Sequence, residues 1–137
     1  MSRLSAFLHP VSVQAEEEIV ISRRFLDEKG NPLPFKVRSL TQEENDVIVK
    51  RSTRRVKLDG QFQEKLDNVE YTRRLVVAAT VEPDFSSKEL CDGLGVVDPL
   101  LAPGKLLLPG EYRKLLDKIM ELSGFDGSES EETEAKN

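Results

Sequence analysis

Few of the residues that usually carry out chemistry occur in this 137-residue chain. The single histidine, His9, precedes a proline near the N-terminus, and nothing around it supplies the orienting partner that a general base needs. The single cysteine, Cys91, has no basic neighbour that would activate its thiol, so we predict a small buried side chain rather than a nucleophile. One cysteine also excludes an intramolecular disulfide and a Cys–Cys metal pair.

The other patterns that could support chemistry are weak. The sequence "DGLGVV", which begins at Asp92, lacks the G-x-x-x-x-G-K spacing of a phosphate-binding loop. The carboxylates of Glu16 to Glu18 are typical of a solvated strand entrance, and acidic residues near the C-terminus lack the fixed geometry of a calcium loop. We therefore expect a protein without enzymatic activity, without a cofactor and without a metal site.

The run "KRSTRRVK" concentrates positive charge in a chain whose formal net charge is −5 and whose pI is near 5.0. One interpretation is a solvated helix end followed by a loop. The other is a contact for phosphates or for an acidic protein surface, which could be the acidic end of this same chain. The overall acidity argues against general nucleic-acid binding, and no aromatic residue within the run is available to stack on bases. The basic residues are Lys50, Arg51, Arg54, Arg55 and Lys57.

A second unusual segment, "GLGVVDPLLAPGKLLLPG" from Gly93 to Gly110, combines many glycines and prolines with six leucines. Glycine and proline predict a loop, but loops are normally polar because they lie on the surface. The segment must either pack into its own domain or be covered by a partner, and both alternatives remain open. The residues predicted to contact a partner are Leu100, Leu101, Leu106, Leu107, Leu108 and Tyr112.

The elements that would position these segments begin with a β-hairpin. Residues Glu16 to Phe25 are rich in β-branched residues, and Pro34 to Leu40 alternate apolar and charged residues. The connection "LDEKGNPLP" contains the glycine, asparagine and prolines that mark a turn, so we predict that the two runs pair.

About four helices are expected after the hairpin. Thr41 and Glu44 match a capping box at the start of the first, and Asp67 to Val81 form the second, which should be central to the core. Ser86 and Ser87 could cap a short third helix that Gly93 stops. The last begins at Pro109, carries a clear apolar face and ends with Gly124 at the C′ position and Phe125 as its apolar contact.

These elements predict an α+β protein with three parts: an N-terminal arm at residues 1–15, a single α+β domain at 16–125 and a disordered acidic tail at 126–137. Leu4, Phe7 and Leu8 give the arm an amphipathic character. No apolar run approaches the ~18 residues of a membrane helix, and no secretory signal opens the chain. We expect a protein of the reducing cytoplasm that has no membrane partner.

The order of these parts resembles the tail assembly chaperones of tailed bacteriophages, in particular the XkdN-like group found in phage-like elements of Gram-positive bacteria. The resemblance covers most of the chain. It includes the start "MSRLSAFLHPVSV", the hairpin "EEIVISRRFLDEKGNPLPFKVRSLTQEEND", the helix "YTRRLVVAATVEPDF" and the closing "LLLPGEYRKLLDKIMELSGF" before an acidic end.

The resemblance implies a non-catalytic role in the cytoplasm of a bacterial host. Such proteins bind the long helical tape measure protein during tail morphogenesis, keep it soluble, help to recruit tail tube subunits and are absent from the mature virion. Binding of the tail tube protein and self-association are further expected contacts. Two alternatives stay open: a regulatory nucleic-acid-binding protein that uses residues 50–57, and a structural tail component retained in the virion.

Overall fold

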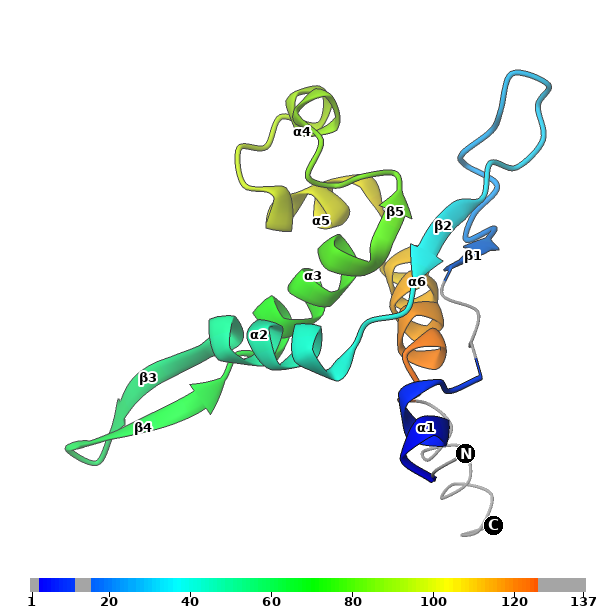
Figure 1. The fold of residues 1–137 in the computed structure, drawn as a ribbon. Helices are drawn as coiled ribbons and strands as arrows, with labels where there is room; N and C mark the ends of the chain where they lie inside the picture. Colours follow the sequence, from blue (N-terminus) through cyan, green and yellow to red (C-terminus); the bar gives the residue numbers. More distant parts are fainter. Residues whose placement is uncertain (1–2, 12–15, 126–137) are drawn as a thin grey trace, which may run out of the picture.

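The computed structural model describes residues 3–11 and 16–125 and combines helices with short antiparallel strands (Figure 1). The predicted α+β class and the N-terminal β-hairpin are confirmed. In the N-terminal arm, helix α1 (Arg3–Leu8) leaves its three large apolar side chains exposed. The predictions for the rest of the arm at 12–15, and for the acidic tail at 126–137, lie outside the described residues.

A three-stranded antiparallel sheet has β2 (Phe35–Arg38) at its centre. β1 (Glu16–Ile19) pairs with one edge of β2, and β5 (Thr80–Glu82) pairs with the other. Alternate side chains of a strand point to opposite faces, so Phe35 and Val37 enter the core together. β5 corrects the helix predicted for residues 67–81, because that helix ends at Ala79 and its last residues join the sheet.

Two helices pack side by side. α2 (Gln42–Ser52) begins with the predicted capping box, in which the Thr41 hydroxyl accepts from the Glu44 amide and the Glu44 carboxylate accepts from the Thr41 amide. α3 (Asn68–Ala79) is tied to α2 by the Tyr71 hydroxyl, which donates to Asn45 Oδ1 at 2.6 Å. Leu75 and Val76 of α3 are fully buried, as expected for a helix at the centre of the core.

A two-stranded hairpin connects these helices and extends from them as an arm (Figure 1). β3 (Thr53–Leu58) and β4 (Gln61–Leu66) pair along their whole length, and the Asp67 amide donates to the Ser52 carbonyl at their base. The hairpin corrects the interpretation of the basic run as a helix end followed by a loop, because the second half of the run forms β3. Its side chains are mostly exposed, so it adds little to the core.

The leucine-rich segment is helical in part, which corrects the loop predicted between Gly93 and Gly110. α4 (Lys88–Leu94) is capped by Ser87 as predicted, but it continues through Gly93 and ends at Gly95, whose φ of 74° gives the left-handed cap. A 3-10 turn η1 and a short helix α5 follow, and Asp98 caps the turn by accepting from the Leu100 amide. Their bounds are Pro99–Leu101 and Ala102–Leu106.

α6 (Pro109–Leu122) packs its apolar face against α3 and the sheet. Gly124 is at the predicted C′ position with φ of 87°. Its amide donates to the Glu121 carbonyl, and the Phe125 amide donates to the Met120 carbonyl, which are the two bonds of a Schellman cap. The buried apolar core draws on β2, on helices α2 to α6 and on the connections between elements: Ile21, Phe35, Val37, Leu40, Ile48, Leu75, Val76, Ala79, Phe85, Cys91, Val96, Ala102, Leu107, Leu115 and Ile119.

Candidate partner-binding site

The structure divides the predicted leucine contacts between core and surface. Leu107 is 8 % exposed and belongs to the core, so it is not accessible to a partner. Leu100, Leu106 and Tyr112 are half-buried, and the Tyr112 hydroxyl lies 3.4 Å from Thr72 Oγ1. Leu101 and Leu108 are exposed. Some apolar side chains of this segment therefore pack in the core of the domain, and others remain exposed at its surface.

An ion pair holds the segment in place. Glu111, near the start of α6, accepts two hydrogen bonds from Arg24, at 2.9 Å from Nε and 2.5 Å from Nη2, and a third from the Leu108 amide. Arg24 also donates to the Leu106 carbonyl. Hydrogen bonding from Arg24 lowers the pKa of Glu111 to about 2. The connection after β1 is thereby fixed to both ends of the short segment 106–108.

Beside this ion pair is an apolar cleft of about 280 Å³. Phe25 packs against Phe35 with ring centroids 5.4 Å apart, and the Leu33 amide donates to the Phe25 carbonyl at 2.7 Å. The β1–β2 connection is held in its conformation by Asp27 Oδ1, which accepts from the backbone amides of Lys29 and Asn31. We use the name apolar cleft for the space lined by Phe25, Leu33, Pro34, Phe35, Glu82, Pro83, Leu90 and Leu106.

Of these lining residues, only Leu106 was predicted to contact a partner. The missed residues come from two regions, one formed by the β1–β2 connection and the start of β2, and the other running from the end of β5 to α4. About 47 residues separate the two regions in the sequence. One signal was present, since Leu33 lies in an otherwise polar turn segment between two prolines. Apolar residues exposed singly are common on protein surfaces, so this one residue could not identify the cleft from the sequence.

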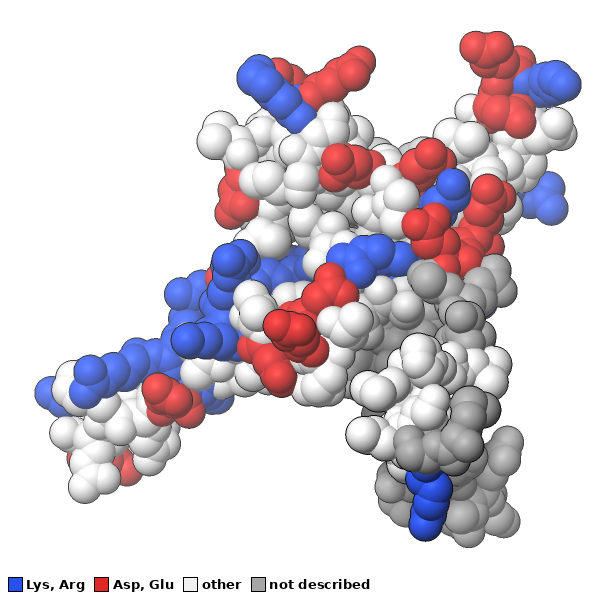
Figure 2. Space-filling model, in the orientation of Figure 1, with Lys and Arg blue, Asp and Glu red and all other residues white. Residues whose placement is uncertain are grey.

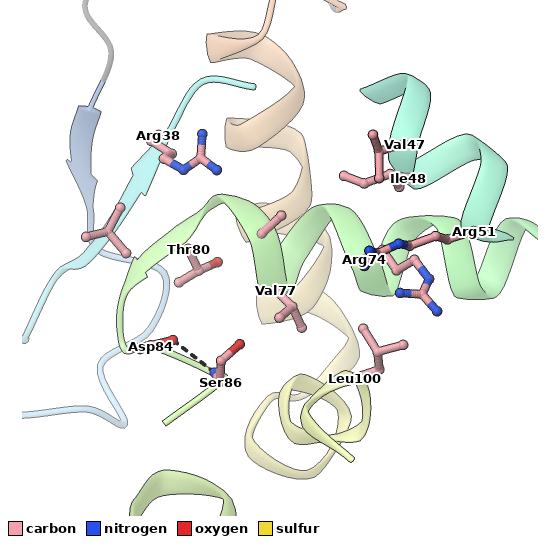
Figure 3. Close-up of a pocket in the computed structure, with 12 residues that line it drawn as sticks. Arg38, Val47, Ile48, Arg51, Arg74, Val77, Thr80, Asp84, Ser86 and Leu100 are labelled. Carbon is pink, nitrogen blue, oxygen red and sulfur yellow. Dashed lines mark hydrogen bonds between the residues drawn. The ribbon is translucent and has the colours of Figure 1, made fainter. Parts of the chain in front are cut away.

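A second depression, the basic groove, lies between α2, α3 and the β5–α4 connection and has a volume of about 500 Å³ (Figure 3). It contains Arg51 from the predicted basic run and Leu100 from the predicted leucine segment, so the fold brings these two distant segments together. In Figure 3, Arg51 and Arg74 lie at one end of the groove and Arg38 lies near the other. The remaining lining residues are Val47, Ile48, Val77, Ala78, Thr80, Val81, Asp84 and Ser86.

Of the other predicted basic residues, Lys50 lies near the end of α2, and the remaining three lie along β3. Lys and Arg side chains form a band that runs from the helices to the hairpin (Figure 2). Arg54 is engaged by Asp67 and Glu70. Arg55 and Lys57 lie over the ring of Phe62, at 4.2 and 5.8 Å from its centroid. Phe62 belongs to the opposite strand, and for this reason the run itself showed no aromatic residue.

The described residues offer binding surfaces and little that could catalyse a reaction. Cys91 is buried, as predicted, and its thiol donates to the Phe85 carbonyl. Within residues 3–11 and 16–125 no group of three or more His, Cys, Asp or Glu side chains is placed to hold a metal ion. In the same ranges no helix has the length and apolarity needed to span a membrane. What the described residues do present is an apolar cleft and a basic groove on a small protein.

Comparison with known proteins shows which class of such proteins this is. The model of the Phage XkdN-like tail assembly chaperone protein family matches residues 4–136. The chain therefore belongs to the XkdN-like family of phage tail assembly chaperones, as its resemblance had indicated. Proteins of this family are generally non-catalytic, which agrees with the absence of recognisable catalytic motifs in the sequence.

Two relatives come from Bacillus subtilis (strain 168). The chain is 38 % identical to the phage-like element PBSX protein XkdN, over 98 % of this chain and 93 % of that protein. It is 39 % identical to the uncharacterized protein YqbN, again over 98 % of this chain and 93 % of the relative. The crystal structure of YqbN superposes with a TM-score of 0.77 and 33 % identity, and the match covers 92 % of this chain and 99 % of that one.

Proposed function

We propose that this tail assembly chaperone binds the tape measure protein of its phage element and keeps it soluble until the tail tube encloses it. A long helical protein exposes apolar stripes before it is enclosed, and a chaperone must cover them reversibly. The apolar cleft is the observation that carries the proposal. It is a preformed depression, and its lining is almost entirely apolar apart from Glu82.

The cleft suits a helix that inserts one or two apolar side chains. Recognition of an amphipathic helix by a groove depends on such anchors at helical spacing. The exposed side chains of Leu33, which is 50 % exposed, and of Leu26 extend the apolar surface beyond the cleft itself. The anchor enters the cleft, and these rim leucines cover the flanking part of the helix.

The test is co-expression of the full chain with the tape measure protein from the same phage element. Leu33→Asp changes the rim of the cleft. Burying the exposed half of a leucine contributes about 1 kcal/mol, and a buried unpaired carboxylate adds a further penalty, so affinity should fall at least about tenfold. Soluble tape measure protein and its co-purification should fall together.

Val97→Asp is the matched control, because Val97 is fully exposed and lines neither depression. It introduces the same charge and should leave co-purification unchanged. Circular dichroism must show that both variants keep the native helix content. Equal retention of the tape measure protein by both variants would refute the assignment of the apolar cleft as its binding site.

We further propose that the chaperone acts in the host cytoplasm, helps to recruit tail tube subunits to the bound tape measure protein, and is released before the virion is complete. Family membership supports this order of events. Mass spectrometry of purified particles distinguishes it from a structural role, because a chaperone should be absent while tape measure and tube peptides are abundant. Detection of this chain in stoichiometric amounts would identify a retained tail component instead.

A further inference from the structure

At one end of the basic groove, two guanidinium groups are only partly neutralised by the described residues. The guanidinium group of Arg51 has no hydrogen-bond or ion-pair partner among residues 3–11 and 16–125. Arg74 approaches Glu70 only to 3.8 Å, and its buried Nε has no hydrogen-bond partner within the same ranges. Glu70 lies closer to Arg54, at 2.7 Å. At this end of the groove Arg51 therefore has no carboxylate partner among the described residues, and Arg74 shares Glu70 with Arg54.

The other charged groups of the groove are already occupied or distant from this end. Arg38 is held by Glu44, which accepts from both Nη1 and Nη2. This contact lowers the pKa of Glu44 to about 2, so its carboxylate is ionised at neutral pH and remains committed to Arg38. Asp84 is the one acidic residue that lines the groove, and it accepts from the Ser86 amide near Thr80 (Figure 3).

The acidic segment 126–137 has the charge that would match this site. It contains five acidic residues and one lysine, and no large apolar residue. The described chain ends near the groove, because Ser123 after α6 accepts through Oγ from the Leu40 amide at 2.9 Å. Leu40 is two residues from Arg38, which lines the groove.

The length of the segment is sufficient to reach the partly neutralised end. α2 has 11 residues, which corresponds to ~16 Å of helix between the Leu40 side and Arg51. Twelve residues in an extended conformation span up to ~40 Å. From position, charge and length together, we propose that residues 126–137 bind in the basic groove of their own chain and place glutamate carboxylates against Arg51 and Arg74.

Such binding would be weak per contact but effective because it is intramolecular. A tether of this length gives an effective concentration on the order of millimolar, so a few exposed charge contacts are enough to populate the bound form. Contacts of this kind are screened by salt. The inference does not depend on tape measure binding, because it concerns the free chaperone.

The experiment uses the full chain with a nitroxide label on Ser130→Cys, and it measures the paramagnetic broadening of backbone amides. Cys91 is buried and should not react with the labelling reagent. Broadening of the amides at 47–51 and 77–80 is the expected result. It should be lost in about 0.5 M NaCl, where the Debye length is only ~4 Å, and in Arg51→Glu.

Lys29→Glu is the control, because it makes the same charge change in the β1–β2 connection, away from the groove. It should leave the broadening intact. Broadening confined to the end of α6, or broadening of the groove that persists in Arg51→Glu, would overturn the proposal. Either outcome leaves the co-purification test of the apolar cleft unaffected, so the two proposals fail separately.

Discussion

Adjacent leucines in the segment 106–108 allow core and surface to be separated by one matched pair of substitutions. Leu107 is 8 % exposed and Leu108 is 55 % exposed. Truncation of Leu107 to alanine removes three buried carbons, worth about 2.4 kcal/mol at ~0.8 kcal/mol each, and the cavity that remains raises the cost toward ~2–5 kcal/mol. For Leu108 the same truncation removes less than half as much buried surface, so the cost should be about 1 kcal/mol or less.

Leu108→Ala also keeps the backbone contact that starts α6. The Leu108 amide donates to Glu111 Oε1, and this bond does not involve the leucine side chain. The free energy of unfolding should be measured by urea titration with far-UV circular dichroism. We expect a large fall in the midpoint for Leu107→Ala and a small one for Leu108→Ala, with similar m-values, because both chains should expose the same surface on unfolding.

The result that would refute this reasoning is an equal loss of stability in the two variants. A small loss in both would place Leu107 on the surface, and a large loss in both would bury Leu108. The comparison also decides how binding experiments are interpreted. Leu107→Asp should prevent folding, so its loss of partner binding would carry no information about an interface. Leu108→Asp should fold, and it is the appropriate probe of the exposed part of this segment.

Two further predictions concern helix termination and acid. Gly93 lies within α4 with open space at its Cβ position, so Gly93→Ala should stabilise the protein by about 0.5–1 kcal/mol. Gly95→Ala should destabilise it by about 1–2 kcal/mol, because the φ angle of Gly95 is positive. Thermal unfolding of both variants shows whether the two effects have opposite signs. The pKa values of Glu44 and Glu111 are lowered to about 2, so their contribution to stability is present above their ordinary pKa near 4.5 and is lost as the pH falls toward 2. In urea titrations between pH 6 and 2, Glu111→Gln should show a shallower loss of stability than the unmodified chain; an unchanged slope would contradict this assignment.

The elements that the sequence predicts well are those whose signals are local. The capping box at Thr41 and Glu44 requires only residues within one helical turn. The same holds for the end of α6, where Gly124 supplies the left-handed conformation and Phe125 completes the cap. The first hairpin follows from two β-rich runs and one turn segment. In each case a few consecutive residues determine the backbone without help from distant parts of the chain.

β5 and the β3–β4 hairpin were not predicted from the sequence, for two different reasons. β5 forms because β2, about 40 residues earlier, offers a free edge, and a strand of three residues at the end of an apolar helix has no pattern of its own. The β3–β4 hairpin did have a signal. Asp59 and Gly60 have φ values of 51° and 81°, as a two-residue hairpin turn requires, and Asp-Gly is a preferred pair there. Its flanking strands are charged on both faces, which obscured the alternation normally used to identify a half-buried strand.

The lining of the apolar cleft and of the basic groove was predicted less completely than the elements because each is assembled from distant segments. The apolar cleft needs Phe25 and Leu33 from the β1–β2 connection and Leu106 from the end of α5, and Arg24 brings them together through Glu111 and the Leu106 carbonyl. Apolar composition alone could not distinguish Leu107, which fills the core, from its neighbours at the surface. Only the folded structure makes that distinction. The apolar residues of such a segment can therefore be considered for client binding only after those that fill the protein's own core have been identified.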